Sequence, residues 1–185
     1  AEIDSDTDYF FILDEITRGN LSKIFGELFM LIENDKRGVP LQLLYADEKF
    51  SVPKNVYLIG MMNTADRSLA MLDYALRRRF AFVEMKPGFE TEGFRVYQKG
   101  LQNAGFDRLI SCVLSLNAVI AEDDSLGEGF CIGHSYFCNL KPERVDAEHL
   151  NAIVEYELIP MLKEYWFDEP DKVRDWSEKL RRAIR

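Results

Sequence analysis

The sequence is poor in the residues that build disulfide scaffolds and metal clusters. It has three cysteines and two histidines among 185 residues. Cys112, Cys131 and Cys138 form no CxxC pair, and their odd number leaves one thiol without a disulfide partner. The sequence also lacks the pattern of a secretory signal peptide. These absences favour a protein of the reducing cytoplasm over a disulfide-stabilised secreted domain.

Two further absences bear on partners. No apolar run reaches the ~20 residues that a membrane span requires, so we expect no membrane partner. Cations are outnumbered, because 23 lysines and arginines face 32 aspartates and glutamates, for a formal net charge of −9. A negative field repels phosphate backbones, and this segment is therefore a poor candidate for direct DNA binding.

Five segments of the first half have the pattern of β-strands. The predicted strands are residues 9–13, 41–44, 49–52, 56–62 and 80–85. The first and fourth are continuous apolar runs, which are typical of strands buried on both faces of a parallel sheet. The second and third predict a β-hairpin. Asn20 is the predicted N-cap of one helix, and residues 69–79 predict a second.

The second half has helical periodicity. The predicted helices cover residues 93–104, 109–121, about 146–167 and 171–184, with an irregular Gly-rich stretch at 126–138. Pro160 should kink the third helix. We therefore predict two parts, an α/β part over residues 1–87 and an all-helical part over 88–185. Only three of the five strands, outside the hairpin, would form the main sheet. A first strand buried on both faces needs further neighbouring strands that the sequence does not supply, and we expect the segment to begin inside a domain.

Acidic residues follow the first predicted strand directly. Asp14 and Glu15 end this apolar run, and ligands of open α/β sheets bind beyond the carboxyl ends of the strands. A hydrophobic strand with two terminal acids is the Walker B arrangement, in which the first acid holds Mg²⁺ and the second activates the attacking water. The motif alone is weak, since many strands end in acids that only cap a turn. Asn63 ends the next buried strand and strengthens the Walker B interpretation, because an amide there can contact the attacking water or the γ-phosphate.

Three consecutive arginines lie at the C-terminal end of the second predicted helix of the first half. Arg77, Arg78 and Arg79 could include a cation that reaches the γ-phosphate of a neighbouring subunit. The alternative is a solvated basic helix end that complements the helix dipole. At most one or two of the three can be catalytic, and the others would pair with acids such as Asp73.

Several strings together resemble the McrB family of AAA+ proteins, from Tyr9 to about Asp168. They are FILDEITRGNLSKIFGELFMLIENDKRG, VPKNVYLIGMMNTADRSLAMLDYALRRRFAFVEMKPGF, GFCIGHSYF and EYWFD. The resemblance implies a truncated AAA+ P-loop core, with a parallel sheet, flanking helices and a β-hairpin insertion, followed by a helical lid. It also implies GTP hydrolysis with Mg²⁺, hexameric rings, a McrC-like nuclease partner, and DNA contact through a separate domain.

The resemblance assigns roles by position. Asp14 matches the metal-binding acid, Glu15 the catalytic acid and Asn63 the sensor 1 amide. Arg78 matches the trans-acting arginine, with Arg79 as a further candidate. The remaining assignments are Arg18 and Arg67 at a subunit interface, Asp66 near the nucleotide, and His134 in the lid near the phosphates. A core histidine bonded to a backbone carbonyl is an equal alternative for His134.

The sequence departs from the family pattern in one respect. It contains no GxxxxGK[ST] loop, and no Gly-rich phosphate cradle replaces it. We therefore expect the segment alone to bind nucleotide weakly or not at all. Two alternatives to a GTP-hydrolysing motor remain: an ATP-using MoxR- or dynein-related AAA+ protein, and a non-catalytic AAA+ scaffold.

Overall fold

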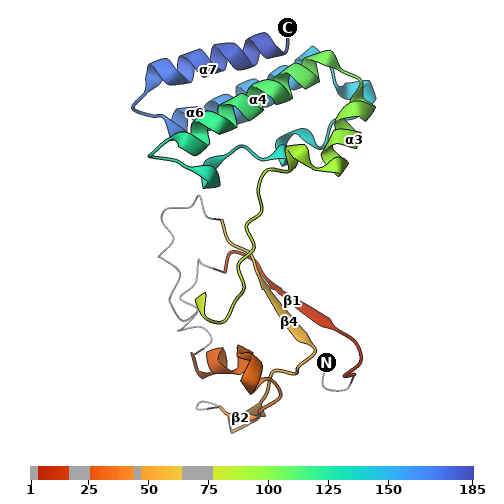
Figure 1. Cartoon of the computed structure of the whole chain (residues 1–185), viewed down its shortest axis with the longest axis vertical. Coiled ribbons are helices and arrows are strands. Elements are labelled where there is room, and N and C mark those ends of the chain that lie inside the picture. The colour runs from red at the N-terminus through yellow and green to blue at the C-terminus, as the bar shows by residue number, and fades with distance from the viewer. Residues whose placement is uncertain (1–3, 17–25, 44–46, 64–76) are drawn as a thin grey trace. The chain divides into compact units, whose positions relative to one another are not determined.

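The computed structural model describes residues 4–16, 26–43, 47–63 and 77–185. The chain divides into two compact units, residues 1–83 and 84–185. The expected domain limits, 1–87 and 88–185, stay a prediction. Figure 1 labels the larger elements of both units.

A two-stranded parallel sheet is the centre of the first unit. Strand β1 (Tyr9–Leu13) pairs with β4 (Val56–Gly60) in a register that sets Tyr9 opposite Val56 and Leu13 opposite Gly60 (Figure 1). The predicted hairpin is also present, as the short antiparallel pair β2 (Leu41–Gln42) and β3 (Lys49–Phe50). Both strand pairings were therefore predictable from the sequence.

Burial of these strands differs from the prediction. Phe10, Phe11 and Ile12 are 64%, 55% and 59% exposed, although the apolar run predicted burial on both faces. Two strands alone leave two faces and two edges open, so nothing in the sheet covers these side chains. The prediction of a third sheet strand at residues 80–85 was wrong. This segment has no regular secondary structure and no strand partner in the described structure, with Val83 86% exposed and Met85 92% exposed.

The described part of the connection between β1 and β2, residues 26–40, contains two 3₁₀ helices. Helix η1 spans Gly26–Ile32 and η2 spans Asn34–Lys36. Within η1, Phe29 and Leu31 are buried, and Leu28 and Ile32 are half-buried. The expected N-cap, Asn20, and most of the predicted helix 69–79 lie outside the described residues.

The second unit is helical, as predicted. Its main helices are α3 (Glu92–Leu101), α4 (Ala104–Glu122), α5 (Ala147–Ala152), α6 (Ile159–Tyr165) and α7 (Pro170–Ala183). Its short helices are η3 (Gly88–Glu90), η4 (Glu128–Phe130), η5 (His134–Phe137), η6 (Pro142–Arg144) and the π-helix η7 (Ile153–Leu158). Side chains of Thr91, Asn103 and Asp146 cap α3, α4 and α5 by accepting backbone N–H bonds.

Helix α4 forms the centre of the core of this unit. Leu109, Val113 and Leu116 are fully buried along one face. By length and composition this helix could cross a membrane, although no uninterrupted apolar run of the sequence reaches ~20 residues. Its apolar face is instead covered by the other helices of the unit, with α7 alongside it. A core helix passes the same test of length and hydropathy as a membrane span.

The predicted kink at Pro160 takes the form of a π turn. Residues 153–158 are π-helical, and the N–H of Ile159 bonds to the carbonyl of Val154, five residues earlier. Proline lacks an N–H, and its ring clashes with the carbonyl four residues before it in an α-helix. The wider turn just before Pro160 accommodates this clash, and the helix continues as α6.

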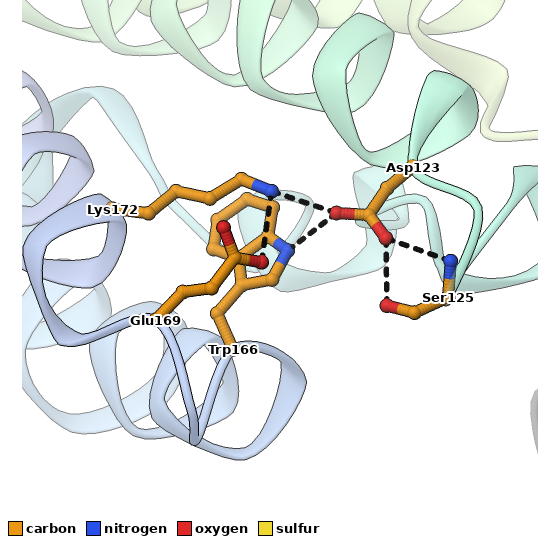
Figure 2. Close-up of polar contacts among 5 residues, drawn as sticks. All are labelled: Asp123, Ser125, Trp166, Glu169 and Lys172. Atoms are coloured by element: carbon orange, nitrogen blue, oxygen red, sulfur yellow. Dashed lines mark hydrogen bonds and ion pairs between the residues drawn. The ribbon is translucent and has the colours of Figure 1, made fainter.

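A polar cluster joins the end of α4 to the start of α7. Figure 2 shows the carboxylate of Asp123 between Trp166, Lys172 and Ser125. Asp123 accepts bonds from Trp166 Nε1 at 2.8 Å, from Lys172 Nζ at 2.7 Å, and from the backbone N and Oγ of Ser125 at 2.9 and 2.6 Å. These bonds hold the pKa of Asp123 below its ordinary value, with the Lys172 bond as the largest cause.

The irregular stretch after α4 is fixed by a buried amide. Asn117 donates from Nδ2 to the carbonyl of Ile132 at 3.0 Å and accepts the N–H of Ile132 at 2.7 Å. Nearby, the hydroxyl of Tyr97 donates to the carbonyl of Phe137 at 2.7 Å and accepts the N–H of Leu140 at 2.9 Å. Two side chains therefore satisfy backbone groups that no helix or strand pairs.

Candidate functional site

The two predicted acids and the predicted amide follow neighbouring strands at one edge of the sheet. The N–H of Met61 bonds to the carbonyl of Leu13 at 2.9 Å, and the N–H of Ile16 bonds to the carbonyl of Met61 at 2.9 Å. The β1–β4 pairing thus continues past both strand ends. Since the strands are parallel, the turn of Asp14 and Glu15 and the segment leading to Asn63 leave the sheet at the same end.

The turn that carries the acids has an unusual backbone. Glu15 has φ +49°, in the left-handed region that non-glycine residues rarely adopt. The Asp14 carboxylate accepts the N–H of Glu15 at 2.9 Å and so stabilises this turn. Both acids are exposed, whereas Ile16 directly after them is buried. Strained positions of this kind concentrate at functional sites.

A small apolar cluster lies beneath these segments. Its buried members are Ile16 and Phe29, and its partly buried members are Leu13, Ile32, Met62 and Phe80. Each predicted site segment contributes to it: Leu13 and Ile16 flank the two acids, Met62 precedes Asn63, and Phe80 follows Arg79. We call this set the anchor cluster. It fixes the acids, the amide and the arginine run to one packed base.

Gly60 is needed for close packing at this base. A β-carbon at this position would lie 2.7 Å from Cδ1 of Ile16 and 3.4 Å from its Cγ2. A glycine at a strand end is a known sign of close approach, so this residue could have been noticed in the sequence. The sequence does not show what approaches Gly60, because its partner Ile16 is separated from it by 44 positions.

The three arginines of the run differ in exposure, because Arg79 is bound within its own unit and the other two are exposed. The NH2 group of Arg79 lies 2.5 Å from Oε1 of Glu33, and the centre of its guanidinium group lies 4.5 Å from the Phe29 ring centroid. The Arg79 side chain is 14% exposed, whereas Arg77 and Arg78 are exposed. The suggested acid partner, Asp73, lies outside the described residues.

His134 lies in the second unit and has a defined tautomer. Its Nδ1 accepts the N–H of Gly88 at 2.9 Å, so the proton of the neutral ring is on Nε2. Phe89 and Phe94 contact the ring edge-on, with centroid distances of 6.2 and 6.0 Å. The bond to a backbone donor differs from the backbone carbonyl that we considered as the alternative partner. Within the described part of the chain, Nε2 has no hydrogen-bond partner.

Three other predicted site residues, Arg18, Asp66 and Arg67, lie outside the described residues. The donor set that is described fits Mg²⁺ rather than a metal held by protein alone. Asp14 supplies hard carboxylate oxygens, and the described residues contain no group of three or more metal-ligating side chains. Mg²⁺ in nucleotide sites is bound by one or two carboxylates together with substrate phosphates. A residue set of this size is therefore sufficient for that ion.

Two protein families match segments of this chain. Residues 6–80 match the family model of an AAA domain of the dynein-related subfamily. The fold is thus that of an AAA protein, with the acids and Asn63 in the matched part. Residues 108–174 match the family model of the McrB alpha-helical lid domain. The chain belongs to the McrB-type AAA family.

Two curated relatives lie within restriction systems. The chain is 50% identical to the type IV methyl-directed restriction enzyme EcoKMcrB subunit of Escherichia coli (strain K12), over 93% of the chain and 40% of that relative. It is 31% identical to the type II restriction enzyme BsuMI component YdiS of Bacillus subtilis (strain 168), over 41% of the chain and 26% of that relative. The chain therefore spans less than half the length of each.

Proposed function

We propose that this chain is the part of a McrB-like AAA+ motor that supplies the metal-binding, water-activating and trans-acting groups for GTP hydrolysis. Asp14 would hold Mg²⁺, Glu15 would activate the attacking water, and Asn63 would orient it. The observation that carries the proposal is the parallel β1–β4 ladder, which delivers the acids and the segment leading to Asn63 to the same sheet edge.

The exposed cation of the arginine run is assigned to a neighbouring subunit's nucleotide. Arg78 is exposed and adjacent to Arg79, whose guanidinium is held within its own unit. Arg78 is therefore our choice for the contact with the neighbouring subunit's nucleotide, and Arg79 would support it from the adjacent position. A cation at the γ-phosphate stabilises transition-state charge and accelerates hydrolysis by about 10³-fold or more. This role requires self-association, which we propose to be a hexameric ring.

His134 fits a phosphate contact from the lid. The bond from Gly88 leaves Nε2–H as the ring's donor, and a neutral imidazole can donate this proton to a phosphate oxygen. In the complete protein we further propose a P-loop, a McrC-like nuclease partner, and a separate domain that binds methylated DNA. The chain alone would be inactive, and the assembly would work in the cytoplasm.

The decisive experiment is Glu15→Gln in the full-length protein. Glutamine keeps the shape of the side chain but cannot accept the proton of the attacking water. We expect turnover to fall below about 1% of wild type while GTP still binds. Glu48→Gln, on the β2–β3 hairpin connection, is the matched control and should keep normal turnover. A Glu15→Gln protein with near wild-type turnover would remove the catalytic role of this residue.

An ATP-using motor is the second candidate. It is favoured by the match to a dynein-related AAA domain. The two candidates share every residue role given above and differ in the base that they select. Competition between GTP and ATP for the full-length protein, measured by the turnover of each in a mixture, decides between them. A third possibility, a non-catalytic scaffold, predicts no turnover of either nucleotide.

A further inference from the structure

The arginine run is connected to the sheet through a residue that no motif marks. Glu33 lies between η1 and η2, and its carboxylate forms the ion pair with Arg79. The Glu33 and Arg79 side chains are 28% and 14% exposed, so the pair is partly removed from solvent. The guanidinium group also lies over the Phe29 ring. An ion pair combined with a cation–π contact fixes an arginine more firmly than either interaction alone.

The segment that carries Glu33 is itself fastened to the sheet. Arg37 donates from Nε to the carbonyl of Ile32 at 3.1 Å and from NH1 to the carbonyl of Val56 at 2.9 Å. It thereby joins the end of η1 to the first residue of β4. Arg37 is half-buried, and this burial lowers the pKa of its guanidinium group, although arginine remains charged at neutral pH. Glu33 is thus held next to the strand that leads to Asn63.

We propose that Glu33 is a positioning residue for Arg78. Glu33 and Phe29 hold Arg79, and the adjacent peptide group then fixes where the exposed Arg78 side chain starts. This inference rests on the proposed trans role of Arg78. Catalytic groups misplaced by about 1 Å lose on the order of 10²-fold in rate, so the anchor of a trans-acting arginine affects turnover without touching the nucleotide. The anchor cluster also supports Asp14 and Glu15 of the same subunit. The acids that act on a subunit's own nucleotide and the arginine that acts on its neighbour's nucleotide therefore rest on the same apolar cluster.

The test compares Glu33→Gln with Asp35→Asn in the full-length protein. Asp35 is a matched control, because it lies two residues away and forms an ion pair with Lys36 at the surface. We expect Glu33→Gln to lower kcat about 10-fold or more, with KM within about 2-fold of wild type. Asp35→Asn should leave both constants unchanged. Light scattering should show the same oligomer for both variants, so a purely structural loss would be recognised.

A charge exchange makes the test independent of folding defects in the single variants. The double variant E33R/R79E restores an ion pair in reversed orientation and should recover turnover relative to E33R and R79E alone. A double variant that folds but stays as slow as the single variants overturns the inference. Arg78→Ala separates this failure from that of the proposed function. If Arg78→Ala keeps normal turnover, the trans role itself is wrong. If Arg78→Ala is inactive and Glu33→Gln matches Asp35→Asn, only the positioning role is wrong.

Discussion

The Asp123 cluster predicts how the stability of the helical unit depends on charge and pH. The substitution Asp123→Asn keeps the shape of the side chain but removes its charge and places an amide NH₂ among four donor contacts. The Asp123 side chain is 9% exposed, and that of Lys172 is 27% exposed. Hydrogen bonds to charged groups contribute about 1.5–3 kcal/mol each, and breaking a fully buried pair costs roughly 3–5 kcal/mol.

Because Lys172 retains some contact with water, we expect Asp123→Asn to lower the free energy of unfolding by about 2–3 kcal/mol at pH 7. For a unit of this size, that loss corresponds to roughly 10–20 °C in Tm. The assay is urea unfolding followed by tryptophan fluorescence. Both tryptophans of the chain, Trp166 and Trp176, lie in the helical unit, so the signal reports this unit alone.

The pH dependence gives a second, independent measurement. The folded-state pKa of Asp123 is below its ordinary value of about 3.9, so its stabilising contribution is complete above that value. The contribution is lost as the pH falls toward the folded-state pKa, because the unfolded chain then binds the proton more readily. The stability difference between wild type and Asp123→Asn should therefore shrink on acidification below about pH 4.

Asp171→Asn is the matched control, since Asp171 is 83% exposed and pairs with Arg174 on the surface. Exposed ion pairs contribute about 0–1 kcal/mol, and this variant should unfold almost as the wild type does. The reasoning is refuted if Asp123→Asn is as stable as Asp171→Asn at pH 7. It is also refuted if the difference between Asp123→Asn and wild type is the same at pH 3 and pH 7.

Three further predictions concern other parts of the chain. Gly60→Ala should destabilise the first unit by about 1–2 kcal/mol and slow turnover of the full-length protein, because Ile16 must move to admit the methyl group. Thermal unfolding measures the loss of stability, and kcat measures the slower turnover. Asn117→Ala should cost about 2–3 kcal/mol in urea unfolding and make the stretch 126–138 sensitive to protease, because both main-chain groups of Ile132 lose their partner. The 185-residue chain should self-associate through its exposed apolar strands, and Ile12→Lys should weaken this association in sedimentation experiments.

Much of the fold could be predicted from local patterns. The unalternating run at Tyr9–Leu13 indicated a parallel strand, and β1 does pair in parallel with β4. Burial could not be predicted in the same way, because the exposure of Phe10 depends on what covers the sheet and not on the run itself. The strand predicted at residues 80–85 is absent for a related reason. An apolar sequence favours extended backbone, but a strand also needs a partner with unpaired backbone groups.

The candidate site was predictable to the extent that it follows from strand direction. Parallel strands deliver their carboxyl ends to one edge, and this places Asp14 and the segment before Asn63 together. The contact between Glu33 and Arg79 spans 46 positions and has no local signal, since an acid in a polar turn looks solvated in any sequence. The contact becomes apparent only from the packing of Phe29 in η1, and of Glu33 after it, against Arg79. Roles assigned to Arg18, Asp66 and Arg67 remain predictions.

The π turn before Pro160 determines which side chains of the following helix face the core. Leu150, Val154, Leu158, Leu162 and Trp166 are each spaced by four positions and are 0–1% exposed. In a regular α-helix of 3.6 residues per turn, a spacing of four drifts by about 40° per step, so the fifth side chain would face away from the first. The wider turn absorbs part of this drift and resets the phase of the helix. Deleting one residue between 155 and 157 would rotate the rest of the helix by about 100° and swing Trp166 out of the interior.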